Sequence, residues 1–230
     1  MAATPNALTL VHTLRGTLEA IEQQIRQHRY VHAVETGQLT RPQLRYFVGE
    51  QWHIIPGDLR SIALLISRCD DLASQQFFRN VLQGEAAALD ALEPLATAVG
   101  MSPADCEAYE PTPGAQAYSA YLAYLCLYGS AAEVAAALSV NFAAWGANCQ
   151  RMGQALQQHY GFQAAEVRFF TQFAAAPPEI SPEALALIET GLQRAEAAPR
   201  IMRATRMLQG YELLFWDTVY ALSTGEQSHA

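Results

Sequence analysis

The sequence is poor in charge and has no cluster of basic residues. Only 16% of its 230 residues are charged, the formal net charge is −8, and the 14 basic residues are scattered along the chain. A nucleic-acid-binding protein neutralises many phosphates with a basic patch, and none is visible here. We therefore predict no nucleic-acid partner.

Two kinds of apolar segment are also missing. The N-terminus has no basic region followed by an apolar stretch, so we expect no signal peptide. No apolar run reaches the ~18–20 residues that span a bilayer. The segment AAEVAAALSVNFAAW is interrupted by Glu133 and Asn141. We therefore predict a soluble, cytoplasmic protein that does not bind a membrane.

The cysteines form no CxxC pair, and strand signals are nearly absent. The four cysteines are widely spaced, which predicts free, mostly buried thiols in a reducing compartment. There is no Asn-Gly or Asp-Gly hairpin turn, no sustained alternation of apolar and polar residues, and no internal repeat. With hydrophobic residues at 51%, the chain can bury a large core without strands.

What the sequence does contain is helical periodicity. Apolar residues recur every three or four positions, as in the series Leu8, Val11, Leu14, Leu18, Ile21 and Ile25. The pattern predicts helices over about 8–36, 41–69, 72–99, 115–128, 131–158, 163–175, 182–197 and 199–222, with a kink or an end at Pro56-Gly57 and a short capped segment after Ser102. We predict one all-α domain over residues 1–230, a bundle of seven or eight helices with a frayed tail from about residue 223.

Two groups of polar residues have spacings that suit metal ligands. His28, His32 and Glu35 stand at i, i+4 and i+7, on one face of the first predicted helix, which describes either a metal half-site or a solvated face. Glu50 and His53 form a Glu-x-x-His pair, the repeated unit of dimetal helix bundles, but no second unit occurs. We favour the solvated face and predict no metal, although spacing alone leaves both groups open.

Other polar residues lie within apolar helices. Asn141 sits in AAALSVNFAAW, and a buried amide needs a polar neighbour or a ligand. Tyr118 belongs to a row of tyrosines at helical spacing, which either fill the core or line a pocket for a flat ligand. Glu212 lies in the aromatic stretch GYELLFWDTVYAL, five residues and about 140° of helix rotation from Asp217. If Glu212 faced inward, burial would raise the pKa of its carboxyl and suit it to acid–base catalysis.

Three stretches carry a resemblance to a known family. HRYVHAVETGQLTRPQLRYFVGEQWHII resembles the opening of the TenA/thiaminase-II family, in the heme-oxygenase-like superfamily. YEPTPGAQAYSAYLAYLCLYGSAAEVAAALSVNFAAWG is similar to its proline loop, tyrosine-bearing helix and following apolar helix. YELLFWDTVY resembles the terminal motif, and the likeness covers residues 8–222. It implies a heme-oxygenase-like helical bundle, a bound small molecule, no cofactor and a homo-oligomer.

The resemblance assigns roles to individual residues. Glu212 falls on the family's catalytic glutamate, which moves a proton to and from a bound pyrimidine. The cysteine nucleophile of thiaminase II is replaced by Asn141, which cannot attack carbon as a thiolate does. The expected ligand-binding residues are Glu50, Gln51, His53, Tyr118, Asn141, Trp145, Tyr211 and Phe215, with Gln51 or its neighbour Glu50 at the position of a pocket aspartate.

A second branch of the superfamily, the CADD-like diiron oxidases, is similar over GEQWHIIPGDLRSIALLISRCDD and EVRFFTQF. At the iron-ligand positions of that branch, Glu85 is present, but Leu92, Phe173, Pro177 and Ile180 cannot bind iron. We therefore expect a metal-independent hydrolase of an aminopyrimidine-like heteroaromatic amine. A non-catalytic small-molecule binder is the alternative, and a diiron oxidase comes last.

Overall fold

The computed structural model describes residues 6–175, 179–194 and 197–226, and within these ranges every regular element is a helix. The elements are α1 (Ala7–Arg26), α2 (Arg29–Glu35), the 3-10 helix η1 (Arg41–Leu44), α3 (Arg45–Arg68), α4 (Leu72–Ala98), α5 (Pro103–Glu107), α6 (Pro113–Tyr128), α7 (Ala131–Tyr160), α8 (Arg168–Ala174), α9 (Pro182–Leu192) and α10 (Ala197–Thr224). The all-α prediction is confirmed. Ten α-helices are described, against the seven or eight expected, because the first predicted helix is divided into α1 and α2 and the short capped segment after Ser102 forms a helix of its own, α5.

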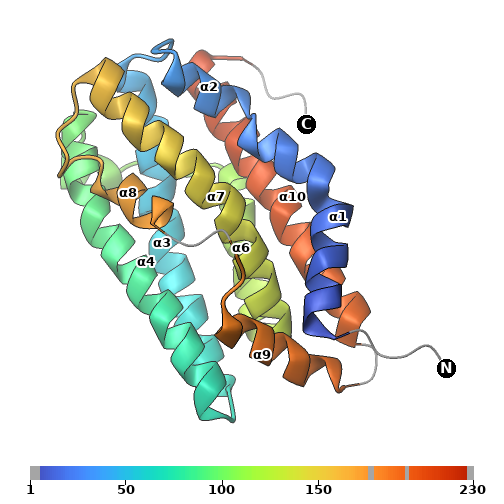
Figure 1. Cartoon of the computed structure of the whole chain (residues 1–230). Helices are drawn as coiled ribbons and strands as arrows, with labels where there is room; N and C mark the ends of the chain where they lie inside the picture. Colours follow the sequence, from blue (N-terminus) through green and yellow to red (C-terminus); the bar gives the residue numbers. More distant parts are fainter. Residues whose placement is uncertain (1–5, 176–178, 195–196, 227–230) are drawn as a thin grey trace.

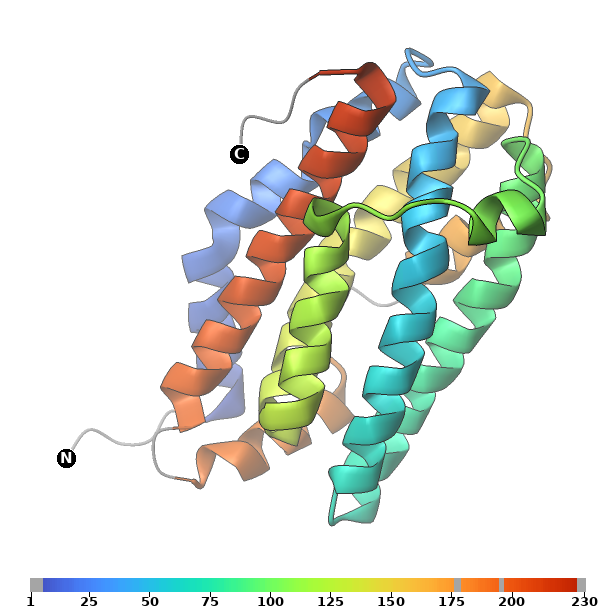
Figure 2. The same cartoon turned by 180° about the vertical axis from the view of Figure 1, so that it is seen from behind.

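The long helices form two layers. In Figure 2, α10, α6, α3 and α4 follow one another across one side of the molecule, and each contacts the next. Figure 1 shows α7 crossing the other side, with α8 near its upper half and α1 and α2 beside it. Helix α7 packs on α10, α8, α9 and α2, so it is the main element of the second layer.

Side-chain caps explain several helix starts. Asn6, Ser130 and Ser181 each accept a hydrogen bond from a backbone N–H of the following first turn. Ser102 forms a capping box with Asp105, as the sequence around it predicts. These caps satisfy N–H groups that have no partner within the helix.

The first predicted helix is broken near residue 27. His28, expected in its interior, is the N-cap of α2, where its Nδ1 accepts a hydrogen bond from the Tyr30 N–H at 3.1 Å. The break changes the direction of the chain between α1 and α2 (Figure 1). His28 is buried at the start of α2, whereas His32 is exposed, so the three side chains His28, His32 and Glu35 do not form the solvated face that was expected.

Helix α3 is continuous through Pro56, where a kink or an end was predicted. A proline removes one hydrogen bond of the helix, to the carbonyl four residues earlier. Packing of α3 against both α4 and α6 holds the helix together despite that loss. Pro94 likewise lies inside α4, as predicted.

An aromatic cluster joins the two layers. The Phe47 ring of α3 lies 6.1 Å from the Trp216 ring of α10 and 5.4 Å from the Phe170 ring of α8. Trp145 of α7 contacts Trp216 at 5.2 Å between ring centroids. Such pairs each add about 0.5–1.5 kcal/mol beyond the burial of their area. The cluster fixes α3, α7 and α10 relative to one another.

The later helices differ in extent from the prediction. Residues 164–167 form turns before α8, and α9 ends at Leu192 rather than near residue 197. Helix α10 continues to Thr224, and Ser223, where fraying was expected, is buried and donates to the Gln43 carbonyl. Residues 227–230 of the predicted tail lie outside the described residues. The single-domain organisation stays a prediction.

Candidate active-site cavity

A cavity lies between the two layers, and six helices line it. The site opens to solvent, and about 450 Å³ of space within it, open solvent included, is free of protein atoms. Its lining residues are Gln51, Ile54 and Asp58 of α3, Glu85 of α4, Tyr118 of α6, Asn141, Phe142 and Trp145 of α7, Phe173 of α8, and Glu212 and Phe215 of α10. The lining thus combines aromatic walls with three carboxyl groups. Within the described chain it includes no arginine or histidine.

Glu212 faces inward and is held by two hydrogen bonds. Only 2% of the residue is exposed. Its Oε1 accepts from the Trp216 indole N–H at 3.1 Å, and its Oε2 accepts from the Asn141 side-chain amide. Trp216 lies one turn further along α10, so the helix itself aligns this donor with the carboxyl.

Burial raises the pKa of Glu212 from its ordinary value of 4.5 to about 8. The hydrogen bonds from Trp216 and Asn141 act in the opposite direction, because they favour the charged carboxylate. Near neutral pH the carboxyl therefore holds its proton. A group with such a pKa can both give and take a proton at the pH of a cell.

The hydrogen bonds of Asn141 are all used within the protein. Its amide nitrogen donates to Glu212 and, at 3.1 Å, to Oε1 of Gln209, while its oxygen accepts from the Tyr118 hydroxyl at 3.0 Å. Since both N–H groups and the oxygen are engaged, Asn141 orients Glu212 and Tyr118. Tyr118 also lines the cavity, and its hydroxyl oxygen, having donated its proton to Asn141, can still accept a hydrogen bond.

Asp58 and Glu85 bring a second pair of carboxyl groups to the cavity. Asp58 is 4% exposed and accepts from the Ser119 hydroxyl at 2.5 Å. Burial raises the pKa of both acids, and the charge of Asp58 raises that of Glu85 further. Our sequence reading treated Glu85 only as a remnant of an iron site and missed Asp58. The signal for Asp58 was the same as for Glu212, an acid within an apolar helical stretch.

Gln51, rather than Glu50, faces the cavity from α3. Gln51 is 5% exposed, and its amide has no hydrogen-bond partner among the described residues. Glu50 is fully buried on another side of the helix, where it accepts hydrogen bonds from Tyr109, Thr112 and Gln116. Glu50 therefore fastens the loop before α6. Of the two alternatives that the sequence left open, Glu50 and Gln51, only Gln51 lines the cavity.

His53 and Tyr211 also lie outside the cavity lining. The His53 ring stacks on that of Tyr109, 6.3 Å between centroids, beside the loop that Glu50 holds. The Tyr211 ring contacts Tyr121 at 5.1 Å. Of the predicted ligand-binding residues, the cavity brings together Gln51, Tyr118, Asn141, Trp145 and Phe215 with Glu212.

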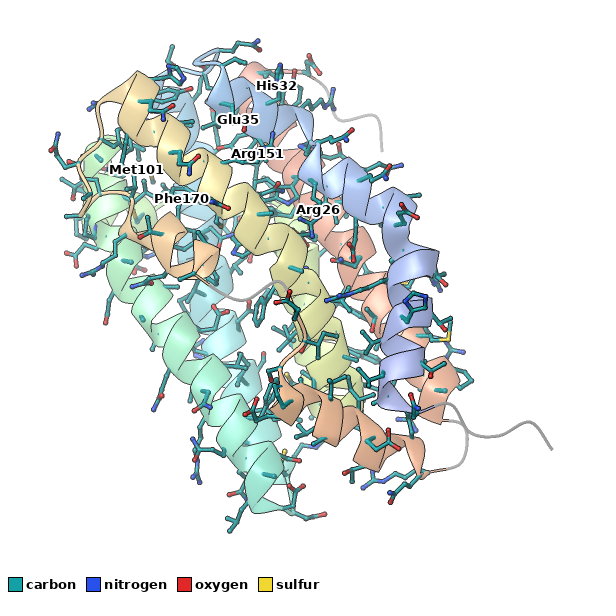
Figure 3. All side chains as sticks on the ribbon, in the orientation of Figure 1. Arg26, His32, Glu35, Met101, Arg151 and Phe170 are labelled. Carbon is teal, nitrogen blue, oxygen red and sulfur yellow. The ribbon has the colours of Figure 1, made fainter. Side chains whose placement is uncertain are left out.

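The first candidate metal group is dispersed by the fold. His28 donates from Nε2 to Asp217 at 3.1 Å, and Asp217 is a surface acid, as predicted, with 43% of its side chain accessible. Glu35 instead accepts from Arg151 of α7, with Nε and Oε1 2.6 Å apart. Figure 3 shows Arg151 between Glu35 and Arg26. The guanidinium group of Arg151 also donates to the carbonyl oxygen of Arg26.

Within the described chain, no group of three or more His, Cys, Asp or Glu residues is arranged to hold a metal ion. Glu50 is not available to join His53 as a metal ligand, because both oxygens of its carboxylate already accept hydrogen bonds. Leu92 is fully buried, and Pro177 lies outside the described residues. Among the helices described, none is long and apolar enough to cross a membrane.

The sequence of this chain is similar to one protein family and to two individual proteins. The profile of the TENA/THI-4/PQQC family matches residues 15–222. A 4-aminobenzoate synthase from Chlamydia trachomatis is 26% identical over 200 residues, covering 83% of this chain and 86% of the relative. The corresponding protein of Chlamydia muridarum is 26% identical over 185 residues, 78% of each chain.

Solved structures share the arrangement of helices. A TenA homologue from Pseudomonas syringae superposes with a TM-score of 0.79 at 12% identity, covering 96% of this chain and 97% of that one. A Shewanella denitrificans domain with a heme oxygenase-like fold gives 0.77 at 16% identity, with 94% and 96% covered. A TenA homologue from Pyrococcus furiosus gives 0.71 at 20%, with 92% and 100% covered. The fold predicted from the sequence, a heme-oxygenase-like bundle, is confirmed.

Proposed function

The chain belongs to the TENA/THI-4/PQQC family, and we propose that it is a metal-independent hydrolase of a small heteroaromatic amine, such as an aminopyrimidine. The observation that carries this proposal is the buried carboxyl of Glu212, which is fixed by two hydrogen bonds at the wall of an aromatic cavity. Glu212 is the acid and the base of the reaction.

In the proposed step, water replaces the amino group of the substrate. The carbon–nitrogen bond breaks, the leaving nitrogen takes the proton of Glu212 and departs as ammonia, and the water oxygen bonds to carbon. One proton of that water stays on the hydroxyl group of the product. The other passes to the Glu212 carboxylate, so the enzyme ends in its starting state. A pKa of about 8 for Glu212 suits both transfers near neutral pH.

Water is the nucleophile because the cavity offers no better one. The chain contains no lysine, so no lysine side chain can form a Schiff base with the substrate, and none of its four cysteines lines the cavity. Asn141 is an amide with all its hydrogen bonds occupied. We assign the water to Glu212 and to the unpartnered amide of Gln51 instead of Asn141.

The polar lining favours a ligand rich in hydrogen-bond donors. Glu212, Asp58, Glu85 and the Tyr118 oxygen are acceptors or acids, and no arginine or histidine in the described residues joins them. The curated relatives are named for 4-aminobenzoate, whose carboxylate would find no cation in this lining. An uncharged or cationic aromatic amine fits better, between the rings of Trp145 and Phe215.

The alternative is a binding protein that has kept the cavity but lost catalysis. The replacement of the family's nucleophile by Asn141 is the observation that favours it. The two functions differ in turnover, because a binder would retain its ligand through purification and release no ammonia. A diiron oxidase ranks last, since only Glu85 of the expected ligand set is present.

The test is ammonia release from a panel of aminopyrimidines by the wild type, Glu212→Gln and the control Asp217→Asn. Asp217 lies on the same helix but outside the cavity. We expect Glu212→Gln to lower kcat by about 10²–10⁴-fold, with Kd for the substrate retained, and Asp217→Asn to keep most of the activity. Unchanged turnover in Glu212→Gln would remove this residue from the mechanism. Binding without turnover in the wild type would select the binder.

The same family membership supports a homo-oligomer located in the cytoplasm. Sedimentation equilibrium of the purified protein tests the first part. Fractionation of the source cells tests the second.

A further inference from the structure

A chain of hydrogen bonds leads from Glu212 to residues that do not line the cavity. The side-chain nitrogen of Asn141 donates to Glu212 and also, at 3.1 Å, to Oε1 of Gln209. Gln209 is fully buried, stands one turn before Glu212 on α10 and lies outside the cavity lining. Gln209 therefore reaches the site through Asn141.

The other end of the Gln209 amide faces an acid of α1. Among the residues that the structure describes, its Nε2 has no hydrogen bond of full geometry. The carboxyl beside it is that of Glu22, a partly exposed residue. Burial raises the pKa of Glu22, while the charges of Arg26 and Arg15 and the Gln209 amide lower it. The chain of polar groups thus begins at a surface carboxyl on the seam between α1 and α10.

This carboxyl determines the direction of the hydrogen bonds that follow. A carboxylate accepts hydrogen bonds and cannot donate them, so the Gln209 amide turns its N–H groups towards Glu22 and its oxygen towards Asn141. Asn141 then turns its N–H groups to Gln209 and Glu212. Its oxygen accepts from the Tyr118 hydroxyl at 3.0 Å. The reverse orientation of Asn141 would set its oxygen against that of Gln209, so the donor offered to Glu212 is fixed from α1.

We infer that Glu22 and Gln209 are positioning residues for Glu212. Acting through Asn141, they hold an N–H donor against the Glu212 carboxyl, and the charge of Glu22 acts on the same carboxyl from α1. This inference rests on the acid–base role proposed for Glu212. It adds a control of that acid from outside the cavity.

The two positioning residues act on Glu212 in opposite directions. Burial is the main cause of the raised pKa of Glu212, and the negative charge of Glu22 raises it further, whereas the N–H of Asn141 lowers it. The other titratable or charged groups near this carboxyl or in its cavity are Arg26 of α1, Tyr118 of α6, Cys149 of α7, Asp58 of α3 and Glu85 of α4. Of these, Arg26 lowers the pKa of Glu212. Removing Glu22 or Gln209 should therefore shift the titration of Glu212 with opposite signs.

The test follows the titration of Glu212 by carbon-13 NMR of glutamate-labelled protein without substrate. The signal that Glu212→Gln removes identifies the residue. Glu22→Gln keeps an acceptor oxygen for Gln209 and removes the charge. Gln209→Met keeps the length of the side chain and removes both hydrogen-bonding atoms. Glu19→Gln, which changes an exposed acid one turn earlier on α1, is the matched control.

We expect Glu22→Gln to lower the midpoint of the Glu212 titration by about 0.5 pH unit or more, and Gln209→Met to raise it by a similar amount. Glu19→Gln should leave the midpoint within about 0.2 pH unit of the wild type, because solvent screens an exposed charge. A general loss of packing would not produce opposite shifts. An unchanged midpoint in Glu22→Gln, or shifts of the same sign in the two variants, would overturn the inference. If Gln209→Met does not fold, Glu22→Gln decides the question alone.

The titration requires no turnover, so its result does not depend on whether an aminopyrimidine is hydrolysed. Where hydrolysis is observed, the pH profile of kcat should move with the NMR midpoint in both variants. KM should stay the same, because neither residue lines the cavity. A kcat profile that stays in place while the midpoint moves would count against the reaction proposed for Glu212. An unchanged midpoint would count against the positioning residues alone.

Discussion

Replacing Glu212 by glutamine should change how the stability of the protein depends on pH. In the folded protein the Glu212 carboxyl has a pKa of about 8, against an ordinary value of 4.5, because it is buried. Between these two values the folded state keeps a proton that the unfolded chain has released. The free energy of unfolding therefore falls as the pH rises. The contribution is fully present below pH 4.5 and is lost above pH 8.

The magnitude follows from the size of the shift. Each pH unit in this window removes about 1.4 kcal/mol of stability, so the whole window removes at most about 5 kcal/mol. Glutamine does not titrate, and the variant lacks this slope. It also leaves one N–H of Trp216 or Asn141 without an acceptor, at a constant cost of about 1–3 kcal/mol. The wild type should be the more stable protein at pH 5, and the variant the more stable one above about pH 7.

The assay is urea unfolding followed by circular dichroism at pH 5, 6, 7, 8 and 9. The exposed glutamate of α1, in the variant Glu19→Gln, controls for the loss of one carboxyl. Asp58 and Glu85 titrate in all three proteins, so their effect cancels in the differences. If the curves of Glu212→Gln and the wild type stay parallel from pH 5 to pH 8, the pKa of Glu212 is not raised and the acid–base role loses its basis.

Three further predictions concern other parts of the structure. Glu50→Ala should lower the free energy of unfolding by about 3 kcal/mol or more, because it leaves several donors of the loop before α6 without an acceptor. Urea unfolding measures this loss. A loss below about 1 kcal/mol would contradict the role given to Glu50. Gly49→Ala should also destabilise α3, because the added methyl carbon would lie 2.5 Å from the ring of Tyr109. Gly84→Ala should instead stabilise α4 by about 0.5–1 kcal/mol, because its methyl carbon would have no other atom within 4 Å. Thermal melts of the two alanine variants should move in opposite directions, and a shared direction would count against the packing described. Trp216→Phe should raise the pKa of Glu212 above 8, because the hydrogen bond from the indole N–H favours the carboxylate. Carbon-13 NMR of labelled glutamate follows this titration. An unchanged midpoint would refute the effect of the Trp216 hydrogen bond on Glu212.

Much of the fold was predictable because it depends on local sequence. Apolar spacing identified the long helices, and the cap at Ser102 marks where a short one begins. These signals act within a few residues, so the sequence displays them directly. The break before α2 was missed, because His28 is an unusual N-cap and the apolar spacing continues across it.

The inward orientation of Glu212 could be predicted in part. Its aromatic neighbours left both orientations open, the family resemblance favoured the inward one, and the structure buries the residue. Periodicity could not separate Glu50 from Gln51, since adjacent residues differ by only about 100° around a helix and α3 is covered by α4 and α6. Both residues are buried, and only the packing decides which one faces the cavity.

The sequence by itself thus determined an all-α chain whose last aromatic motif carries the glutamate Glu212. The tertiary structure decided which polar groups meet. Asp58 and Glu85 lie on different helices, and Asn141 reaches Glu212 across 71 residues of sequence. Such pairings depend on the rotation and crossing of whole helices, which are set by packing between distant segments and leave no local pattern in the chain.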